Sequence, residues 1–199
     1  MTRQTFILGL GLLISLSLSG CILSSQWSHN LALPTYGAEG IPSTLNDGKL
    51  DTIATVDANN TRVFTLKFAE IQPIQKVIIR NGNLFWFDVS YFDTETREWE
   101  TFHSVRHRRH ISNPYQRDIS AQRAQPEFVI DRLDFQTNMI QVNVSRTVDD
   151  QIIPKPMREP GDQVVNMRRG IGGYNPFFRI IKPAQAKIRE IEVYHLGIQ

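Results

Sequence analysis

Apolar and polar side chains alternate along short segments from about residue 30 onward, and no stretch shows the period of an amphipathic helix. Residues 63–68 illustrate the pattern, because Phe64, Leu66 and Phe68 alternate with Thr65 and Lys67. A period of two is typical of a β-strand with one buried face. Segments of this kind predict eight strands, at residues 63–68, 75–80, 85–92, 98–103, 127–135, 139–145, 177–181 and 187–195.

The connections between these segments are polar, contain Gly and Pro, and include no helical pattern, which predicts an all-β fold. Successive strands without intervening helices favour an antiparallel sandwich. Residues 93–97 are expected to form the turn of a hairpin. Two connections are long, residues 104–126 and 146–176, and loops of that length are usually functional or flexible. We find no internal repeat and no boundary for a second folded domain.

The N-terminus predicts a targeting segment. Arg3 is followed by an apolar run over residues 6–18, about 13 residues, which is shorter than the roughly 20 that a membrane-spanning helix needs. The run ends in Leu18-Ser19-Gly20-Cys21, which resembles the bacterial lipoprotein signal, in which the chain is cut before a cysteine that carries diacylglycerol. The resemblance implies a signal peptide at 1–20, a lipidated tether at 21–29 and a folded domain at 30–199.

The same resemblance implies a lipid-anchored protein of the bacterial cell envelope whose first partner is the bilayer, through acylated Cys21. In such lipoproteins, an Asp directly after the cysteine alters the sorting of the protein between membranes. Ile22 stands at that position, so the resemblance implies the outer membrane if the cell has two membranes. The alternative is an ordinary secreted protein with a chance cysteine. A single Cys cannot form a disulfide within its own chain, so the domain must be stabilised by its core.

Charge and composition narrow the partners only slightly. The chain has 22 Lys and Arg against 20 Asp and Glu, a near balance that gives no argument for nucleic acid or a strongly anionic partner. Aromatic residues make up 10% of the chain, as expected of a globular protein rather than a disordered stalk.

Three stretches in the same order resemble the discoidin, or coagulation-factor type C, family. They are "NLALPTYGAEGIPSTLNDGKLDT", "FTLKFAEIQPIQKVIIRNGNLFWFDVSYFDTETREWETF" and "AKIREIEVYHLG". Asp47, Gly48 and Thr52 match the family's Asp-Gly turn, whereas Ala54 stands where Trp is usual. The resemblance covers roughly residues 30–195 and implies a galactose-binding-like jelly roll of about eight antiparallel strands, whose paired terminal strands leave the opposite rim free.

Many relatives hold a structural calcium ion near the Asp-Gly turn, so the resemblance also implies a metal site. Calcium takes six to eight oxygen ligands. The candidates are Asp47, Asp51 and Thr52, together with Glu190 or Glu192 from the last strand. The alternative is an Asx turn without metal, because Asn46-Asp47-Gly48 is favourable turn chemistry by itself.

A basic segment, "HSVRHRRH", is the first candidate for ligand binding. Arg106, Arg108 and Arg109 could recognise phosphate or carboxylate groups by bidentate hydrogen bonds. The alternative is a solvated hairpin extension. A zinc site at His103, His107 and His110 is disfavoured, because no Cys and no nearby carboxylate joins them.

A second candidate follows from the sugar-binding relatives, which combine an aromatic platform with polar donors on their rim loops. Arg168, Arg169, Tyr174 and Asn175 would suit that role, with Trp86 or Tyr115 as another platform. The alternative is that the glycines of this segment only let the chain turn. No nucleophile elbow, metalloprotease motif or recognisable carboxylate pair is present, and the resemblance points to a binding module, so we expect a binding protein and not an enzyme.

These observations predict a membrane-anchored binding module that recognises a glycan or another cell-envelope polymer through its rim loops. The alternative is a structural or assembly lipoprotein that binds a partner envelope protein. An uncharacterised hydrolase is a third, weaker interpretation.

Overall fold

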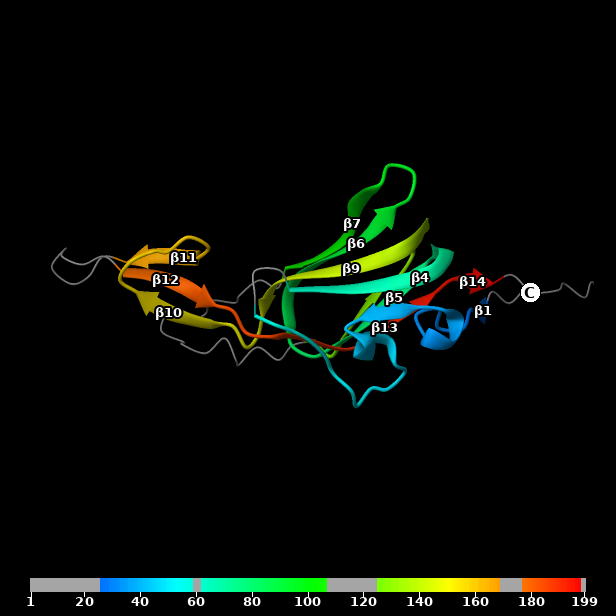
Figure 1. Cartoon of the computed structure of the whole chain (residues 1–199), viewed down its shortest axis with the longest axis horizontal. Helices are drawn as coiled ribbons and strands as arrows, with labels where there is room; N and C mark the ends of the chain where they lie inside the picture. The colour runs from blue at the N-terminus through cyan, green and yellow to red at the C-terminus, as the bar shows by residue number, and fades with distance from the viewer. Residues whose placement is uncertain (1–25, 59–61, 107–124, 169–176, 198–199) are drawn as a thin grey trace, which may run out of the picture.

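The structure, a computed structural model, describes residues 26–58, 62–106, 125–168 and 177–197. Two antiparallel sheets form a sandwich (Figure 1). The first has the order β2-β4-β9-β6-β7 and consists of β2 (Glu39–Ile41), β4 (Arg62–Ile74), β9 (Phe135–Thr147), β6 (Leu84–Asp93) and β7 (Glu98–Arg106). The second has the order β3-β13-β5-β8 and consists of β3 (Ala54–Val56), β13 (Ala186–Tyr194), β5 (Lys76–Asn81) and β8 (Glu127–Ile130).

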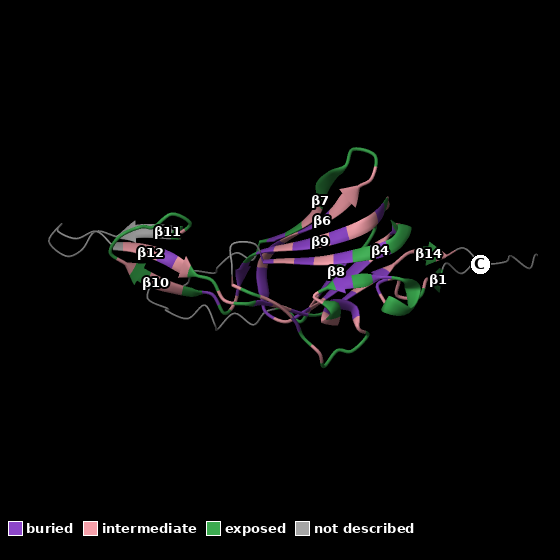
Figure 2. Cartoon of the chain, in the orientation of Figure 1, coloured by how far each residue is buried: buried purple, intermediate pink, exposed green. Residues whose placement is uncertain are grey.

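The inward positions of the predicted alternation fill the core between the sheets. Phe64 and Leu66 on β4, and Phe87 on β6, are completely buried, as is Ile79 on β5. Phe87 also meets Phe128 of β8 edge to face, with 4.9 Å between ring centroids. The alternating outward positions are more exposed, which gives the striped strands of Figure 2. The prediction of an all-β antiparallel sandwich is therefore confirmed.

The predicted hairpin turn is also present. β6 ends at Asp93 and β7 begins at Glu98, and the side chain of Asp93 accepts a hydrogen bond from the Glu95 N–H at 2.8 Å. Arg97 closes the turn in the left-handed region, with φ of 61°, and its N–H donates to the Asp93 carbonyl at 2.9 Å. An Asx turn of this kind is a local property, so the sequence could predict it.

The termini lie together at one end of the sandwich, as the jelly roll implied. β1 (Gln26–Trp27) pairs with β14 (Leu196–Gly197), and the Leu31 N–H donates to the Val193 carbonyl at 2.8 Å. Residues 26–28, which we assigned to the tether, thus bond to the C-terminal segment, and only residues 22–25 separate Cys21 from described structure. Two short 3₁₀ helices, η1 (Pro34–Tyr36) and η2 (Ser43–Asn46), follow β1. In the described part of the chain, no helix has both the length and the apolar character that a membrane span requires.

The opposite end departs from the prediction, because the connection 146–176 is not a plain loop and the rim is not free. β10 (Gln151–Lys155), β11 (Gln163–Arg168) and β12 (Phe177–Lys182) form a separate sheet in the order β10-β12-β11. This three-stranded sheet, called the arm below, projects from the sandwich at the end away from the termini (Figure 1). Residues 177–181 were expected in the sandwich and belong to the arm instead, because their pairing partners are contributed by the long connection.

A second difference concerns residues 127–135, which we predicted as one strand. The chain leaves β8 at Ile130 and enters the other sheet at Phe135, and Arg132 lies between them in the left-handed region with φ of 58°. Alternation alone cannot show where a chain crosses from one sheet to the other.

Candidate functional site

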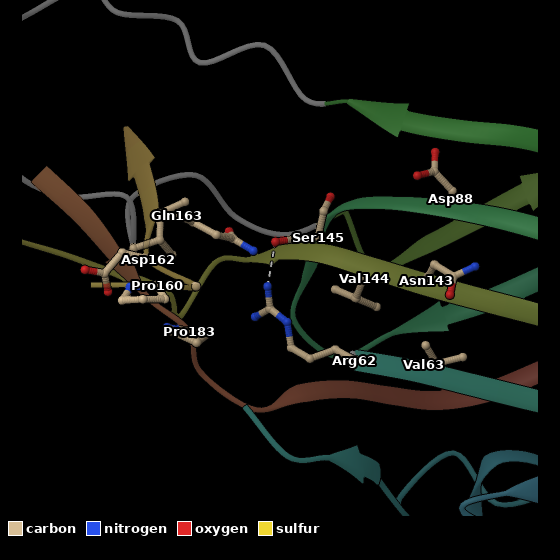
Figure 3. A pocket seen from close by; sticks show the side chains of 12 residues that line it. Arg62, Val63, Asp88, Asn143, Val144, Ser145, Pro160, Asp162, Gln163 and Pro183 are labelled. Carbon is tan, nitrogen blue, oxygen red and sulfur yellow. Dashed lines mark hydrogen bonds between the residues drawn. The ribbon is translucent and has the colours of Figure 1, made fainter. Parts of the chain in front are cut away.

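A cleft of about 510 Å³ lies where the arm meets the outer face of the five-stranded sheet (Figure 3). One wall comes from three neighbouring strands of that sheet and the other from the arm and its root. Its lining residues are Arg62, Val63, Asp88, Asn143, Val144, Ser145, Pro160, Gly161, Asp162, Gln163, Ile181 and Pro183. The volume falls within the roughly 300–1,000 Å³ that is typical of ligand sites.

The sandwich wall is a row of residues held in register across three strands. Val63 on β4 is paired with Asn143 on β9, and Asn143 with Asp88 on β6. Each of these residues follows or precedes a core residue, so its side chain points to the outer face of the sheet. The sheet therefore places an apolar, an amide and a carboxylate side chain side by side at the mouth of the cleft.

The carboxylates in the cleft wall are already engaged. Nη2 of Arg106 donates to both carboxylate oxygens of Asp88 at 2.7 Å, and the Ser104 hydroxyl donates at 2.5 Å. Burial tends to raise the pKa of Asp88, but these hydrogen bonds outweigh it and the pKa is lowered. Asp162 accepts hydrogen bonds from the Glu159 N–H at 2.7 Å and from Lys155 Nζ at 3.1 Å. Both lower its pKa, and the bond from Glu159 has the larger effect.

The base of the cleft is a buried ion pair that joins the sandwich to the root of the arm. Nη1 of Arg62 donates to Oδ1 of Asp150 at 2.7 Å, and their side chains are 3% and 0% exposed. Asp150 also accepts from the backbone N–H of Ala184 at 2.9 Å, and Arg62 donates to the Ala184 carbonyl at 3.0 Å. Nη2 of Arg62 donates to the Ser145 carbonyl at 2.6 Å, as Figure 3 shows.

This network satisfies both charges without solvent. Burial by itself would raise the pKa of Asp150, but the hydrogen bonds from Arg62, Ala184 and Thr147 outweigh it and lower the pKa. Asp150 directly precedes β10, the first strand of the arm, and Ala184 lies two residues after β12. The ion pair and its hydrogen bonds therefore tie both connections of the arm to Arg62, at the start of β4. The arm wall of the cleft is thereby placed opposite the sheet wall.

The side-chain amides of Asn143 and Gln163 make no hydrogen bond within the described residues, and they stand on opposite walls. An amide offers both donors and an acceptor. Val63, Pro160, Ile181 and Pro183 give the cleft apolar surface. The arrangement can bind a molecule that has hydroxyl or amide groups on one side and an apolar face on the other. Such a ligand needs no charge of its own.

Two of the predicted ligand-binding residues lie beside this cleft, in adjacent strands. Trp86 on β6 is the register partner of Arg106 on β7. Arg106 is held by Asp88, as described above, and the guanidinium carbon of Arg146 lies 5.2 Å from the centroid of the Trp86 ring. A smaller hollow of about 360 Å³ lies between β7 and β8 and is lined in part by His103 and Arg106.

Most of the other predicted ligand-binding residues lie outside the described residues. These are Arg108, Arg109, Arg169, Tyr174 and Asn175, together with Tyr115, the alternative platform. The predicted lipidation site Cys21, and His107 and His110 of the disfavoured zinc site, also lie outside them. Arg168 ends β11, but only its backbone is described. The predictions for these residues stay predictions.

The predicted metal turn is organised around Glu190. Oε1 of Glu190 accepts from the Gly48 N–H at 3.2 Å, and Oε2 is buried without a hydrogen-bond partner within the described residues. Burial first, and then the nearby charges of Asp47 and Glu192, raise its pKa to about 7. Asp47 Oδ1 accepts from the Thr52 hydroxyl at 2.9 Å and from the Lys49 N–H at 3.0 Å.

A calcium ion fits the donor types of this turn. Asp47 and Glu190 supply carboxylates and Thr52 a hydroxyl, and a cation would compensate the buried, unpartnered oxygen of Glu190. Among the described residues, no group of three His, Cys, Asp or Glu side chains forms a metal site, so backbone carbonyls would have to complete the shell. Glu192 instead accepts from Arg80 Nε and from the Tyr194 hydroxyl, both at 2.7 Å, and Asp51 is exposed.

Asn143 and Gln163 in the cleft, and Asp150 at the root of the arm, were not found from the sequence. Asn143 occupies an outward position of a regular strand, which is where any solvent-facing polar residue would stand. Gln163 and Asp150 lie in a connection whose strands had no alternation strong enough to detect. The one available signal was Arg62, a charged residue directly before the apolar positions of β4, and charged residues in that place are usually solvated.

Comparison with known proteins identifies the fold. No family model and no curated protein matches the sequence. Among solved structures, a fucose-binding module of Streptococcus pneumoniae, SpX-3, is 12% identical with a TM-score of 0.52, over 85% of this chain and 100% of that chain. A module named CpGH89CBM32-6, produced by Clostridium perfringens, is 11% identical with a TM-score of 0.50, over 85% of this chain and 100% of that one.

A third similar structure is the family 32 carbohydrate-binding module of Streptococcus pneumoniae EndoD, 12% identical with a TM-score of 0.50, over 83% of this chain and 99% of that chain. At these identities the similarity establishes the architecture and nothing finer. The chain has the galactose-binding-like jelly-roll fold.

Proposed function

We propose that this protein is a lipid-anchored binding module of the cell envelope that holds a glycan chain in the cleft between the arm and the five-stranded sheet. The observation that carries the proposal is the pair of uncommitted amides, Asn143 and Gln163, on opposite walls of an open cleft whose charged groups are already paired. Similar structures bear names that mention carbohydrate or fucose binding, which supports this class of ligand.

The electrostatics of the cleft favour a neutral glycan. Asp88, Asp162 and Arg62 are each compensated within the protein, so a charged ligand would find no free partner. Hydroxyl groups of a pyranose can bond to amides as donors and acceptors, and its apolar face can lie against Pro160 or Ile181. A neutral or N-acetylated polysaccharide is therefore expected to bind better than an anionic one.

The cleft also favours binding over hydrolysis. Sugar hydrolysis commonly needs one carboxylic acid that keeps its proton near neutral pH. Both carboxylates that line the cleft, Asp88 and Asp162, have lowered pKa values and are ionised. Neither is suited to the role of general acid.

Anchoring and metal binding complete the proposal. Acylation of Cys21 would hold the domain at a membrane, and calcium at Asp47, Thr52 and Glu190 would stabilise the turn against β13. The sequence motif around Cys21 supports the first and the unpartnered Glu190 oxygen supports the second. Retention of radiolabelled palmitate by the wild type but not by Cys21→Ser would support acylation; equal labelling of the two would refute it.

A glycan array tests the ligand. Asn143→Ala and Gln163→Ala should each weaken binding about tenfold, the loss of one or two hydrogen bonds to the ligand. Gln141→Ala is the matched control, because Gln141 lies on the same face of β9, two residues from Asn143, and does not line the cleft. Absence of binding to every glycan, or equal loss in the control variant, would refute the proposal.

A second candidate, binding to a partner envelope protein, is supported by the edges of the arm. Within the described residues β10 and β11 each pair with β12 alone, so each presents an edge to which an extended segment could add. Co-purification of a defined envelope protein that is lost when Ile153 is replaced by Pro, with no glycan bound by the wild type, would favour this function.

A further inference from the structure

The end of the molecule that carries both termini exposes large apolar side chains. Trp27 on β1 is 43% exposed, Tyr36 on η1 47%, Ile71 on β4 51% and Leu196 on β14 38%. Figure 1 shows β1, β14 and η1 together at this end, and Figure 2 shows them as exposed. Four such side chains at one end of a domain are unusual for a surface that meets only water.

These residues belong to one continuous surface. Trp27 is the register partner of Leu196, and Lys76 Nζ lies 4.8 Å from the centroid of the Trp27 ring. The Tyr36 ring stacks on that of His29, two residues after Trp27 in the chain, with 5.8 Å between centroids. η1 is joined to β4 near Ile71 by a hydrogen bond from the Ala69 N–H to the Gly37 carbonyl at 3.1 Å. We call Trp27, Tyr36, Ile71, Lys76 and Leu196 the terminal face.

The length of chain before β1 limits how far this face can be from the proposed anchor. Four residues, 22–25, separate Cys21 from Gln26. A fully extended chain spans at most about 3.6 Å per residue, so Gln26 can lie no more than about 18 Å from Cys21. If Cys21 is acylated, Gln26 stays within that distance of the membrane interface whatever the conformation of the tether, and Trp27 of the terminal face is the next residue in the chain.

We propose that the terminal face rests on the lipid bilayer and fixes the orientation of the domain on the membrane. Trp and Tyr are the residues that favour the headgroup region, and a Lys beside them can pair with anionic headgroups. The inference rests on the proposed acylation of Cys21. In this orientation the arm and the cleft, at the opposite end of the molecule, face away from the membrane and toward the glycan.

The lone cysteine allows a test that does not depend on acylation in the cell. Every described element lies within residues 26–197, so a chain of residues 21–199 can be coupled through Cys21 to a maleimide lipid in vesicles. The vesicles contain phosphatidylethanolamine and phosphatidylglycerol, with or without lipids brominated near the headgroup, which quench tryptophan fluorescence at the interface. The difference between the wild type and Trp27→Phe isolates the signal of Trp27.

We expect the bromolipids to reduce the Trp27 signal at least about twofold, as for a tryptophan at the interface. Trp86 is the control, because it lies on β6 at the end of the sandwich that carries the arm, where its register partners are Arg106 and Arg146. The difference between the wild type and Trp86→Phe should show little quenching. Thermal unfolding of both variants verifies that each is folded.

Quenching of Trp27 no greater than that of Trp86, at both low and high surface density of the protein, would overturn the proposal. Failure of acylation is detected separately, by the labelling of Cys21→Ser described above. A protein that is not acylated but whose coupled form shows the quenching would retain the docking face and lose only the anchor.

Discussion

The sandwich and the arm are built from the same kind of strand but are stabilised differently. In the sandwich, inward side chains such as Phe64, Phe87 and Ile140 are completely buried between two sheets. Among the arm residues whose burial is described, 151–164 and 178–182, Ile180 is the one buried hydrophobic residue, and it lies outside the main core. A three-stranded sheet needs a hydrophobic face to be stable on its own, and one buried hydrophobic residue provides little of it.

Polar contacts hold the arm in place where hydrophobic burial is lacking. The arm depends on its root, where Asp150 and Ala184 are both bonded to Arg62. The sandwich needs no such contact, because its two sheets bury one another. The arm can thus be held in place by a few polar atoms, and the cleft beneath it depends on the same atoms.

The largest expected loss of stability comes from a cavity in the core of the sandwich. Ile140→Ala should lower the free energy of unfolding by about 3–4 kcal/mol, because it removes completely buried methyl groups. Ile152→Ala, at a half-buried position of the arm, should cost less than about 1 kcal/mol. Urea denaturation measures both, and equal losses would show that the arm is as well packed as the sandwich.

The ion pair at the root should come next. Asp150→Asn leaves the guanidinium of Arg62 buried beside a neutral amide, which should cost about 3 kcal/mol. Amide hydrogen exchange should accelerate in β10 and β12 more than in β4 or β9. Asp162→Asn is the control within the arm, and it should leave exchange at the root unchanged; slower or unchanged exchange in Asp150→Asn would contradict the role of the ion pair.

The next prediction concerns the stability of the sandwich with and without calcium, which depends on Glu190. Its pKa is raised from 4.5 to about 7, so its protonated form stabilises the fold and that stability is lost as the pH rises toward and through about 7. Without calcium, Glu190→Gln should therefore be more stable than the wild type above neutral pH, by at most about 3 kcal/mol.

Adding calcium should reverse that order. The wild type should gain roughly 3 kcal/mol at a hundredfold excess of calcium over its Kd, whereas Glu190→Gln should gain little. Thermal melts with calcium and with a chelator make the comparison. An unchanged melting temperature in the wild type would show that calcium does not bind at this turn.

The smallest effect is expected in acid. The pKa of Asp150 is lowered, so its pairing with Arg62 contributes stability above the ordinary value of 3.8, and this stability is lost as the pH falls through the lower, folded-state value. The melting temperature of the wild type should fall more steeply below about pH 4 than that of Asp150→Asn. Parallel curves would show that the pKa of Asp150 does not differ between the folded and the unfolded chain.

Local patterns predicted much of the sandwich and little of the candidate site. The alternation of Phe64, Leu66 and Phe68 identified β4, and Asp93 identified the turn before β7. The same reasoning placed residues 177–181 in the sandwich, because apolar strand residues look alike whichever sheet they join. The bonds that Arg62 makes to Asp150 and Ala184 span 88 and 122 residues, and no pattern within a strand specifies them.

By itself, the sequence determined the long strands of the sandwich with one buried face, where the hairpin turns, and that a single cysteine follows an apolar N-terminal run. Those properties depend on residues a few positions apart, where alternation and turn chemistry act. Only the tertiary structure decided that the long connection forms an arm, that Asn143 and Gln163 face one cleft, and that Trp27 shares a surface with Leu196. These depend on which strands pair and in which register, and that choice is made by the packing of the whole chain.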